Sequence, residues 1–160
     1  AEGLLDLIPH RGAVITRQSE AELAEVFCVL AALEGLAGEL ATMQASAETV
    51  QDIAEMTTAL RRTYDEADRP TYFRINQAIH KAVLAAAENE TLLRAHELLA
   101  FRVQRARYQA NLTPERWRAA VEEHEAILDA LRTRDAERCG KLMKDHLLRK
   151  FASIKAKTQA

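Results

Sequence analysis

Apolar residues recur at intervals of three and four along most of the chain, the spacing that places them on one face of an α-helix. In the first such segment the stripe consists of Leu23, Phe27, Leu30, Leu33, Ala37 and Leu40. Turn and cap residues divide the pattern into six predicted helices, at about residues 20–43, 47–67, 70–88, 90–110, 114–134 and 136–156. Because short connections favour antiparallel neighbours, the sequence predicts an all-α fold, an antiparallel six-helix bundle.

Residues typical of helix ends support these boundaries. Ser19 is placed to cap the first helix, Thr113 with Pro114 begins the fifth, and Asp135 can cap the sixth. The sixth helix is expected to finish with three lysines, Lys150, Lys155 and Lys157. Their positive charges suit the negative end of a helix dipole.

The first 17 residues have another pattern. Two short apolar segments, 3–8 and 13–16, flank Pro9-His10-Arg11-Gly12, which predicts a short β-ribbon with a tight turn and an exposed His10. A ribbon of this size is unstable alone, so we expect it to be the remnant of a larger unit.

Composition limits the setting of the chain. With 160 residues, 48% of them hydrophobic and 29% charged, it resembles one ordinary globular domain. We find no apolar run near the roughly 20 residues that cross a bilayer, and no signal pattern, so we expect a cytoplasmic protein without a membrane partner. Cys28 and Cys139 stand in apolar stripes without a CxxC pairing, which favours core positions.

The charge balance bears on nucleic-acid binding. A net charge of -2 and a pI near 6.3 argue against DNA binding by this segment, because neutralising phosphates requires a basic face. If DNA is a partner, we expect another part of the protein to hold it.

Three histidines take places where Leu or Ile would be expected in apolar stripes. His80, His124 and His146 belong to three different predicted helices, and Asn76 lies one turn before His80 on the same face. His124 and His146 stand at similar distances from the turn between the last two helices, so they can meet. A buried imidazole needs partners for its nitrogens, and one metal ion can serve several. His96, in the stripe of the fourth helix, is a reserve ligand. The pattern also fits core histidines that hydrogen-bond to protein groups.

Four segments carry a resemblance to a known family. They are Asn76-Gln-Ala-Ile-His80, Ala87-Glu-Asn89 followed by Leu92-Leu93, the stretch 124–135 that begins with His124-Glu-Ala-Ile-Leu, and Asp145-His146-Leu147. From about residue 20 to 148 the chain resembles the FCD effector-binding domain of GntR-type bacterial transcription regulators, the FadR subfamily. The spacing of His124, Asp135 and His146 is its most specific element. The opening segment 3–15 similarly resembles the wing that ends a winged helix-turn-helix domain.

The resemblance implies a regulatory role and a metal. Residues 1–17 would be the remnant of the wing with a linker, and 18–160 the effector-binding and dimerisation domain of a homodimeric regulator whose DNA-binding domain is absent. The implied ligands of a divalent metal are Asn76, His80, His124 and His146, with a small carboxylate effector completing the coordination. For such ligands zinc is the first expectation and nickel the second, while manganese suits carboxylate-rich sites better.

Two residues depart from the family pattern. Asn76 replaces the usual Asp, which should weaken metal affinity while leaving more of the metal's charge for an anionic effector to neutralise. Leu30 stands where the family motif R-x-x-L-E has Arg. Arg102 and Arg105 are candidate replacements for binding the effector's carboxylate, although both could equally lie at the surface.

Two alternatives remain open on the sequence. One is a metal-dependent helical hydrolase, but H-E-x-x-H and Glu-x-x-His pairings are absent. Glu123 and Glu125 flank His124 but diverge from it by about 100° around the helix, so neither is aimed as a general base. The other alternative is a metal-free bundle that serves only dimerisation. We expect a regulator without enzymatic activity.

Overall fold

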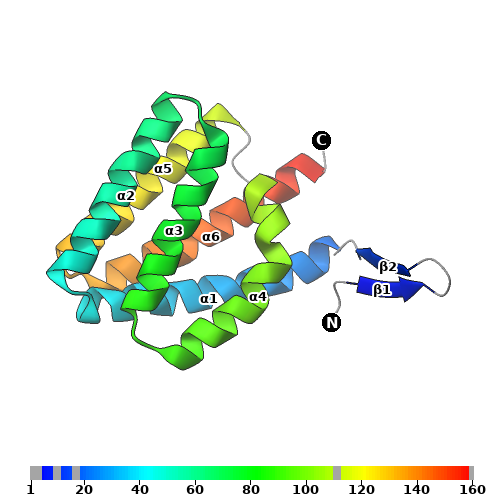
Figure 1. Ribbon diagram of the computed structural model, residues 1–160, viewed down its shortest axis with the longest axis horizontal. Helices are drawn as coiled ribbons and strands as arrows, with labels where there is room; N and C mark the ends of the chain where they lie inside the picture. Colours follow the sequence, from blue (N-terminus) through cyan, green and yellow to red (C-terminus); the bar gives the residue numbers. More distant parts are fainter. Residues whose placement is uncertain (1–4, 9–11, 16–18, 110–112, 159–160) are drawn as a thin grey trace.

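The computed structural model of the chain describes residues 5–8, 12–15, 19–109 and 113–158 (Figure 1). Its elements are β1 (Leu5–Ile8), β2 (Gly12–Ile15), α1 (Glu20–Gln44), α2 (Ala47–Asp65), α3 (Arg69–Ala86), α4 (Glu90–Gln109), α5 (Pro114–Arg132) and α6 (Ala136–Thr158). The six predicted helices are confirmed, with boundaries within a few residues of those expected. The predicted end of the fourth helix, at 110, lies outside the described residues.

Three helices end about two residues before the predicted boundary. The predicted last residues, Ala67, Glu88 and Arg134, have φ angles of 58°, 47° and 56°. This left-handed conformation ends a helix, because the next turn can no longer continue. The predicted caps are confirmed: the side chain of Ser19 accepts the backbone N–H of Glu22, and that of Thr113 accepts the N–H of Arg116.

The ribbon is confirmed as an antiparallel pair. Leu5 lies opposite Ile15, and Ile8 lies opposite Gly12. The remaining residues of the predicted ribbon and turn, including His10, lie outside the described ranges.

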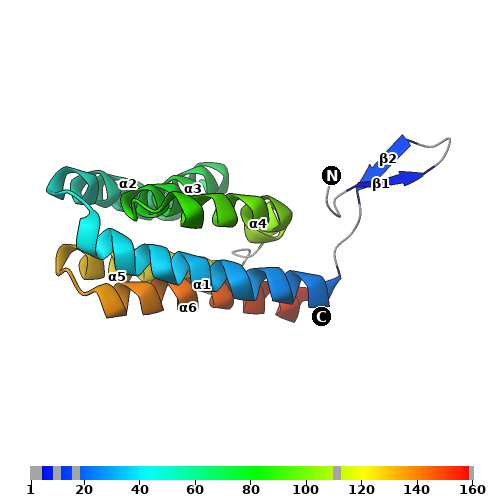
Figure 2. The same ribbon diagram turned by 90° about the horizontal axis from the view of Figure 1, so that it is seen from below.

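The helices form two layers, with α2, α3 and α4 in one and α1, α5 and α6 in the other (Figure 2). In the second layer α1 and α6 run antiparallel, and Lys155 near the end of α6 lies 3.0 Å from Glu20 at the start of α1. The main apolar core lies between the layers, and its largest buried members include Ile53, Leu60 and Leu131.

Small residues let α1 and α6 approach closely. A Cβ added at Gly38 would lie 3.0 Å from Cγ of Met143 and 3.1 Å from the backbone oxygen of Cys139. The buried face of α1 also differs from the predicted stripe, since Leu33 and Leu40 are only half-buried. The fully buried positions are Phe27, Leu30, Ala31, Glu34, Ala37 and Ala41.

The structure corrects two predictions from composition. Helix α1 is long and apolar enough to cross a membrane by length and composition, contrary to our expectation, but 56% of its most apolar stretch is buried inside the bundle. A helix apolar on most faces is what a central position among α3, α4, α5 and α6 requires. Cys139 is buried as predicted, whereas Cys28 is exposed, because it lies on the outer face of α1.

Candidate metal centre

Three helices bring the predicted histidines together. His80 of α3, His124 of α5 and His146 of α6 each offer a ring nitrogen, and these nitrogens lie within 4.8 Å of one another. The ring centroids of His124 and His146 are 4.5 Å apart, and His80 lies 5.2 Å from His146. All three side chains are buried. The predicted meeting of the histidines is thus observed.

In two of the three imidazole rings, Nδ1 lies beside a hydrogen-bond acceptor. Nδ1 of His124 lies 2.7 Å from the backbone oxygen of Ala120, and Nδ1 of His146 lies 2.6 Å from Oε2 of Glu123. Because these oxygens only accept, each Nδ1 must carry the proton, and each Nε2 keeps its lone pair. Neither Nε2 has a hydrogen-bond partner among the described residues. This arrangement, with the second nitrogen fixed by an acceptor, is typical of metal-binding histidines.

His80 is held by a carboxylate in a looser geometry. Its Nδ1 lies 2.8 Å from Oε2 of Glu34, but the two atoms are not aligned as a hydrogen bond. Its Nε2 is also buried without a partner in the described part of the chain. All three Nε2 atoms of the cluster are therefore without a hydrogen-bond partner among the described residues.

The three histidines fit a metal ion. Zinc–nitrogen bonds of about 2.0–2.1 Å place tetrahedral ligands roughly 3.4 Å apart. Since the ring nitrogens already lie within 4.8 Å of one another, small ring rotations would bring them to this separation. Burial lowers the pKa of His80 to about 4, and burial also lowers the pKa values of His124 and His146 well below the ordinary range. All three rings are therefore neutral at pH 7, the state that binds metals.

The fourth predicted ligand is bound to a lysine. Asn76 is buried, and its Oδ1 accepts a hydrogen bond of 2.8 Å from Nζ of Lys150, while its Nδ2 has no partner among the described residues. Our assignment of Lys150 to the helix C-terminus is wrong, because it lies on the buried face of α6, one turn after His146. Burial, together with the charge of Arg107, lowers the pKa of Lys150 well below its ordinary value.

Glu34 connects the cluster to α4. It is fully buried, and its Oε1 lies 3.1 Å from Nε2 of His96 and 3.0 Å from an Arg107 guanidinium nitrogen. His96 thus faces Glu34 and does not join the three-histidine group. Burial raises the pKa of Glu34, but its contact with the His80 ring and the positive charge of Arg107 outweigh this effect and hold the pKa well below 4.5. Glu34 is therefore ionised.

The sequence analysis missed Glu34 and Arg107 as members of the site. A signal for Glu34 was present, because it stands one turn after Leu30 and two turns after Phe27, on the face of α1 that is buried. The predicted stripe used Leu33 instead of its neighbour Glu34. A signal for Arg107 was also present, because it follows Val103 by one turn and so continues the stripe of α4 that contains His96.

Glu123 fixes His146 from the outer side of the bundle. It diverges from His124, as predicted, and its carboxylate accepts from Nδ1 of His146 and from the guanidinium of Arg116 at 3.0 Å. Nη1 of Arg149 lies 3.3 Å from Oε1 of the same carboxylate. Glu123 therefore orients one of the candidate ligands, a role that the sequence analysis did not assign.

Of the two arginines predicted to bind an effector, the structure describes the side chain of only one. Arg102 is half-buried, and its charge acts on Glu22 near the start of α1. The side chain of Arg105 lies outside the described residues. Leu30 is buried in a second apolar cluster with Leu147 and Val103, where an Arg would lack water.

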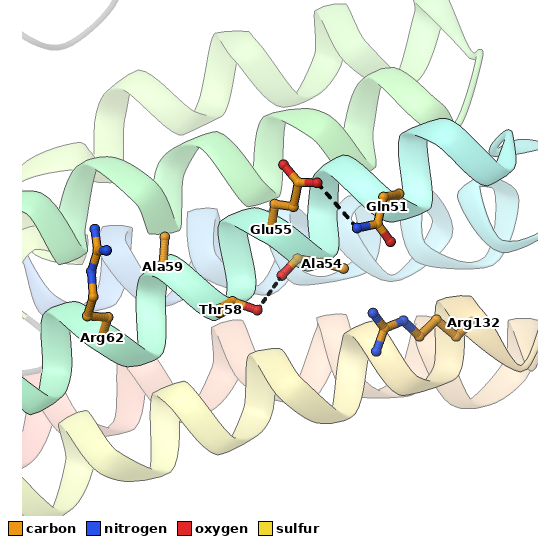
Figure 3. Close-up of a pocket in the computed structure, with 7 residues that line it drawn as sticks. All are labelled: Gln51, Ala54, Glu55, Thr58, Ala59, Arg62 and Arg132. Atoms are coloured by element: carbon orange, nitrogen blue, oxygen red, sulfur yellow. Dashed lines mark hydrogen bonds between the residues drawn. The ribbon is translucent and has the colours of Figure 1, made fainter.

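A groove between α2 and α5 lies apart from this site (Figure 3). Its lining residues are Gln51, Ala54, Glu55, Thr58, Ala59, Arg62 and Arg132. None of the predicted metal ligands borders the groove.

Comparison with known proteins identifies the family. The model of the FCD domain matches residues 25–149. The chain belongs to the FCD domain family. This FCD domain is 33% identical over 139 residues to the "Probable D-xylose utilization operon transcriptional repressor" of Paenarthrobacter nicotinovorans, with 86% of the chain matched. It is 27% identical to the HTH-type transcriptional repressor GlaR of Escherichia coli K12, with 92% matched. The chain spans 60% of the length of the first relative and 71% of the second.

Solved structures share the fold of this FCD domain. It superposes on E. coli McbR/YncC with a TM-score of 0.86 at 19% identity, covering 96% of this chain and 78% of that one. A GntR family regulator from Pseudomonas syringae pv. tomato DC3000 gives a TM-score of 0.69 at 20% identity, covering 98% and 65%. These matches confirm the all-α FCD bundle.

Proposed function

We propose that this FCD domain is the effector-sensing part of a bacterial transcription regulator, and that it binds a divalent metal through Asn76, His80, His124 and His146. The observation that supports the proposal best is the set of three buried histidines with unpartnered Nε2 atoms. Two of these rings have their Nδ1 atoms fixed by acceptors. Zinc suits such ligands best, and nickel second.

The proposed switch couples the site to helix packing. A metal held by these residues would supply a coordination position for a small organic acid. Through that ion, the histidines and Asn76 would hold α3, α5 and α6 together. Because the site is closed, with side chains no more than 2% exposed, an acid reaches it only when the helices separate. Such a change in packing would reposition the DNA-binding domains of a regulator.

DNA binding is assigned to a separate domain. The chain carries a net charge of -2 and spans only 60% of the first relative, which is a transcriptional repressor. We therefore propose that residues 1–17 contain the end of a winged helix-turn-helix domain with its linker, and that 18–160 form the regulatory domain. A regulator that acts on DNA in a bacterium works in the cytoplasm, and we propose no enzymatic activity for it.

We also propose a homodimer that uses the outer face of α1. Val29, Leu36 and Met43 follow one another at intervals of seven residues, and their exposed fractions are 50%, 43% and 65%. Seven-residue spacing places these side chains along one line of the helix, as in helix–helix contacts. A second copy of the chain could cover this line.

Elemental analysis of the protein, purified without added metals or chelators, tests the metal. We expect near-stoichiometric zinc or nickel in the wild type, loss of the metal in His124→Ala, and full occupancy in the control His96→Ala, which removes a buried histidine outside the cluster. Full occupancy in His124→Ala would contradict the ligand assignment.

A metal-free dimerisation bundle is the second candidate, and the contact between Asn76 and Lys150 favours it. The amine occupies the oxygen that a metal would need. Wild-type protein that stays free of metal after incubation with zinc and with nickel would support this alternative.

A further inference from the structure

We propose that Lys150 is the residue that binds the carboxylate of the effector, through an ion pair formed beside the metal's open position. The inference rests on the proposed function and assigns a role to a residue that is not itself a metal ligand. Its basis is the position of Lys150: Nζ lies 2.8 Å from Asn76, and the residue follows His146 by one turn on the same buried face.

Lys150 lacks an anionic partner. It is 2% exposed, and its hydrogen-bond partner Asn76 carries no charge. A buried ammonium is costly unless a negative group compensates it. No carboxylate lies within ion-pair distance of Lys150 in the described part of the chain.

The two nearby carboxylates are already bound to other groups. Glu34 contacts His80, His96 and Arg107. Glu123 contacts His146, Arg116 and Arg149. Both acidic residues orient histidines, so neither can turn to Lys150 without releasing a candidate ligand. No carboxylate among the described residues is thus free to pair with a protonated Lys150, and we infer that the carboxylate of the effector supplies the compensating charge.

Metal binding would make this need larger. If Asn76 turns its oxygen to a metal, Lys150 loses its hydrogen-bond acceptor. A divalent cation beside an ammonium then leaves an excess of positive charge in a buried space. The carboxylate of an effector would supply negative charge to the metal and to Lys150 at once. In this chain the positive group beside the metal would be Lys150 of α6. Position 30 of α1, where the family motif has Arg, carries only the apolar side chain of Leu30.

Titration with sodium acetate, followed by thermal unfolding and at ionic strength held constant with sodium chloride, tests the proposal. We compare wild type with Lys150→Met, which keeps the length of the stem and removes the charge. Lys144→Met, an exposed lysine of the same helix, is the control. Every variant is analysed for metal content after loading with zinc.

We expect acetate to stabilise the wild type and Lys144→Met equally. Lys150→Met should retain zinc and bind acetate at least about tenfold more weakly. Equal acetate binding by Lys150→Met would overturn the proposal. Should Lys150→Met fail to fold by circular dichroism, Lys150→Gln replaces it with the same expectation.

The two proposals fail in different ways. A wild type that takes up no zinc yet gains stability from acetate, with that gain lost in Lys150→Met, would refute the metal while supporting the role of Lys150. A wild type that binds zinc but is not stabilised by acetate would refute the role of Lys150 in carboxylate binding and leave the metal site intact.

Discussion

Asn76 offers a metal only a neutral amide oxygen, and that oxygen is bound to Lys150. A carboxylate at the same position would add charge attraction to the coordination bond. In the proposed metal site, this residue would therefore control how strongly the three neighbouring histidines retain an ion.

Asn76→Asp should tighten zinc binding, by about tenfold or more, because an anionic ligand replaces a neutral one. Competition with a zinc chelator measures the change. Gln77→Glu is the control, since it adds the same charge on the adjacent position of α3 but on another face. Unchanged affinity in Asn76→Asp would argue against Asn76 as a ligand.

The buried histidines predict how the stability of the metal-free protein depends on pH. In the folded chain the pKa of His80 is about 4, whereas in the unfolded chain it returns to about 6.5. Between these values the unfolded state binds more protons, so stability is lost as pH falls from 6.5 towards 4. His80 alone should contribute about 3 kcal/mol over this window. Burial of His124 and His146 acts in the same direction.

Urea unfolding in the presence of a chelator, repeated across this pH range, measures the effect. His80→Gln should show a shallower loss of stability than the wild type, because one proton-binding group is removed. A free energy of unfolding that stays constant between pH 6.5 and 4 would contradict the burial of neutral imidazoles.

Among the helices, the pair α1 and α6 depends on the absence of a side chain at Gly38. A Cβ added at Gly38 would lie 3.0 Å from Cγ of Met143 and 3.1–3.2 Å from backbone atoms of Cys139. The helix that carries His146 and Lys150 is thereby held tightly against α1. Spacing at this contact sets the position of α6 relative to the candidate metal centre.

Gly38→Ala should destabilise the protein by about 1–3 kcal/mol, because backbone atoms of α6 cannot move aside as a flexible side chain can. Gly140→Ala is the matched control. The three atoms nearest to its new Cβ, at 2.5–3.0 Å, all belong to the side chain of Glu39, which is exposed and can rotate away. We expect Gly140→Ala to leave stability unchanged or to raise it slightly, since alanine favours helix more than glycine does. Thermal unfolding of both variants provides the comparison, and equal losses would show that close packing at Gly38 is not the cause.

For the whole molecule, the proposed homodimer depends on the outer line of α1. Leu36 lies midway between Val29 and Met43 on that line and is 43% exposed. In a single chain these apolar side chains face water.

Leu36→Glu should convert the proposed dimer into a monomer, because a charge would be buried at the centre of the contact. Light scattering coupled to size-exclusion chromatography measures the mass, and Gln51→Glu, which adds the same charge on the exposed surface of α2, should remain dimeric. A wild type that is monomeric under the same conditions would refute this interface.

The sequence alone determined the helices and the three histidines. Periodicity of three and four, with caps such as Ser19 and Thr113, depends on contacts within a few residues, so it can be read from the chain. His80, His124 and His146 stood out because each replaces an apolar residue in a stripe, and the stripe already fixes the inward direction of its side chain.

Only the tertiary structure decided the partners of those histidines. Glu34 and Lys150 are charged, and charged residues are expected at the surface unless another group compensates them. Glu34 pairs with Arg107, and Lys150 donates a hydrogen bond to the neutral Asn76. Each of these partners lies more than 70 residues away in the chain and is reached only when the two layers pack. Local spacing cannot show a contact between distant segments, and the packing of α1 and α4 against the histidine helices therefore decided which charges are buried beside the site.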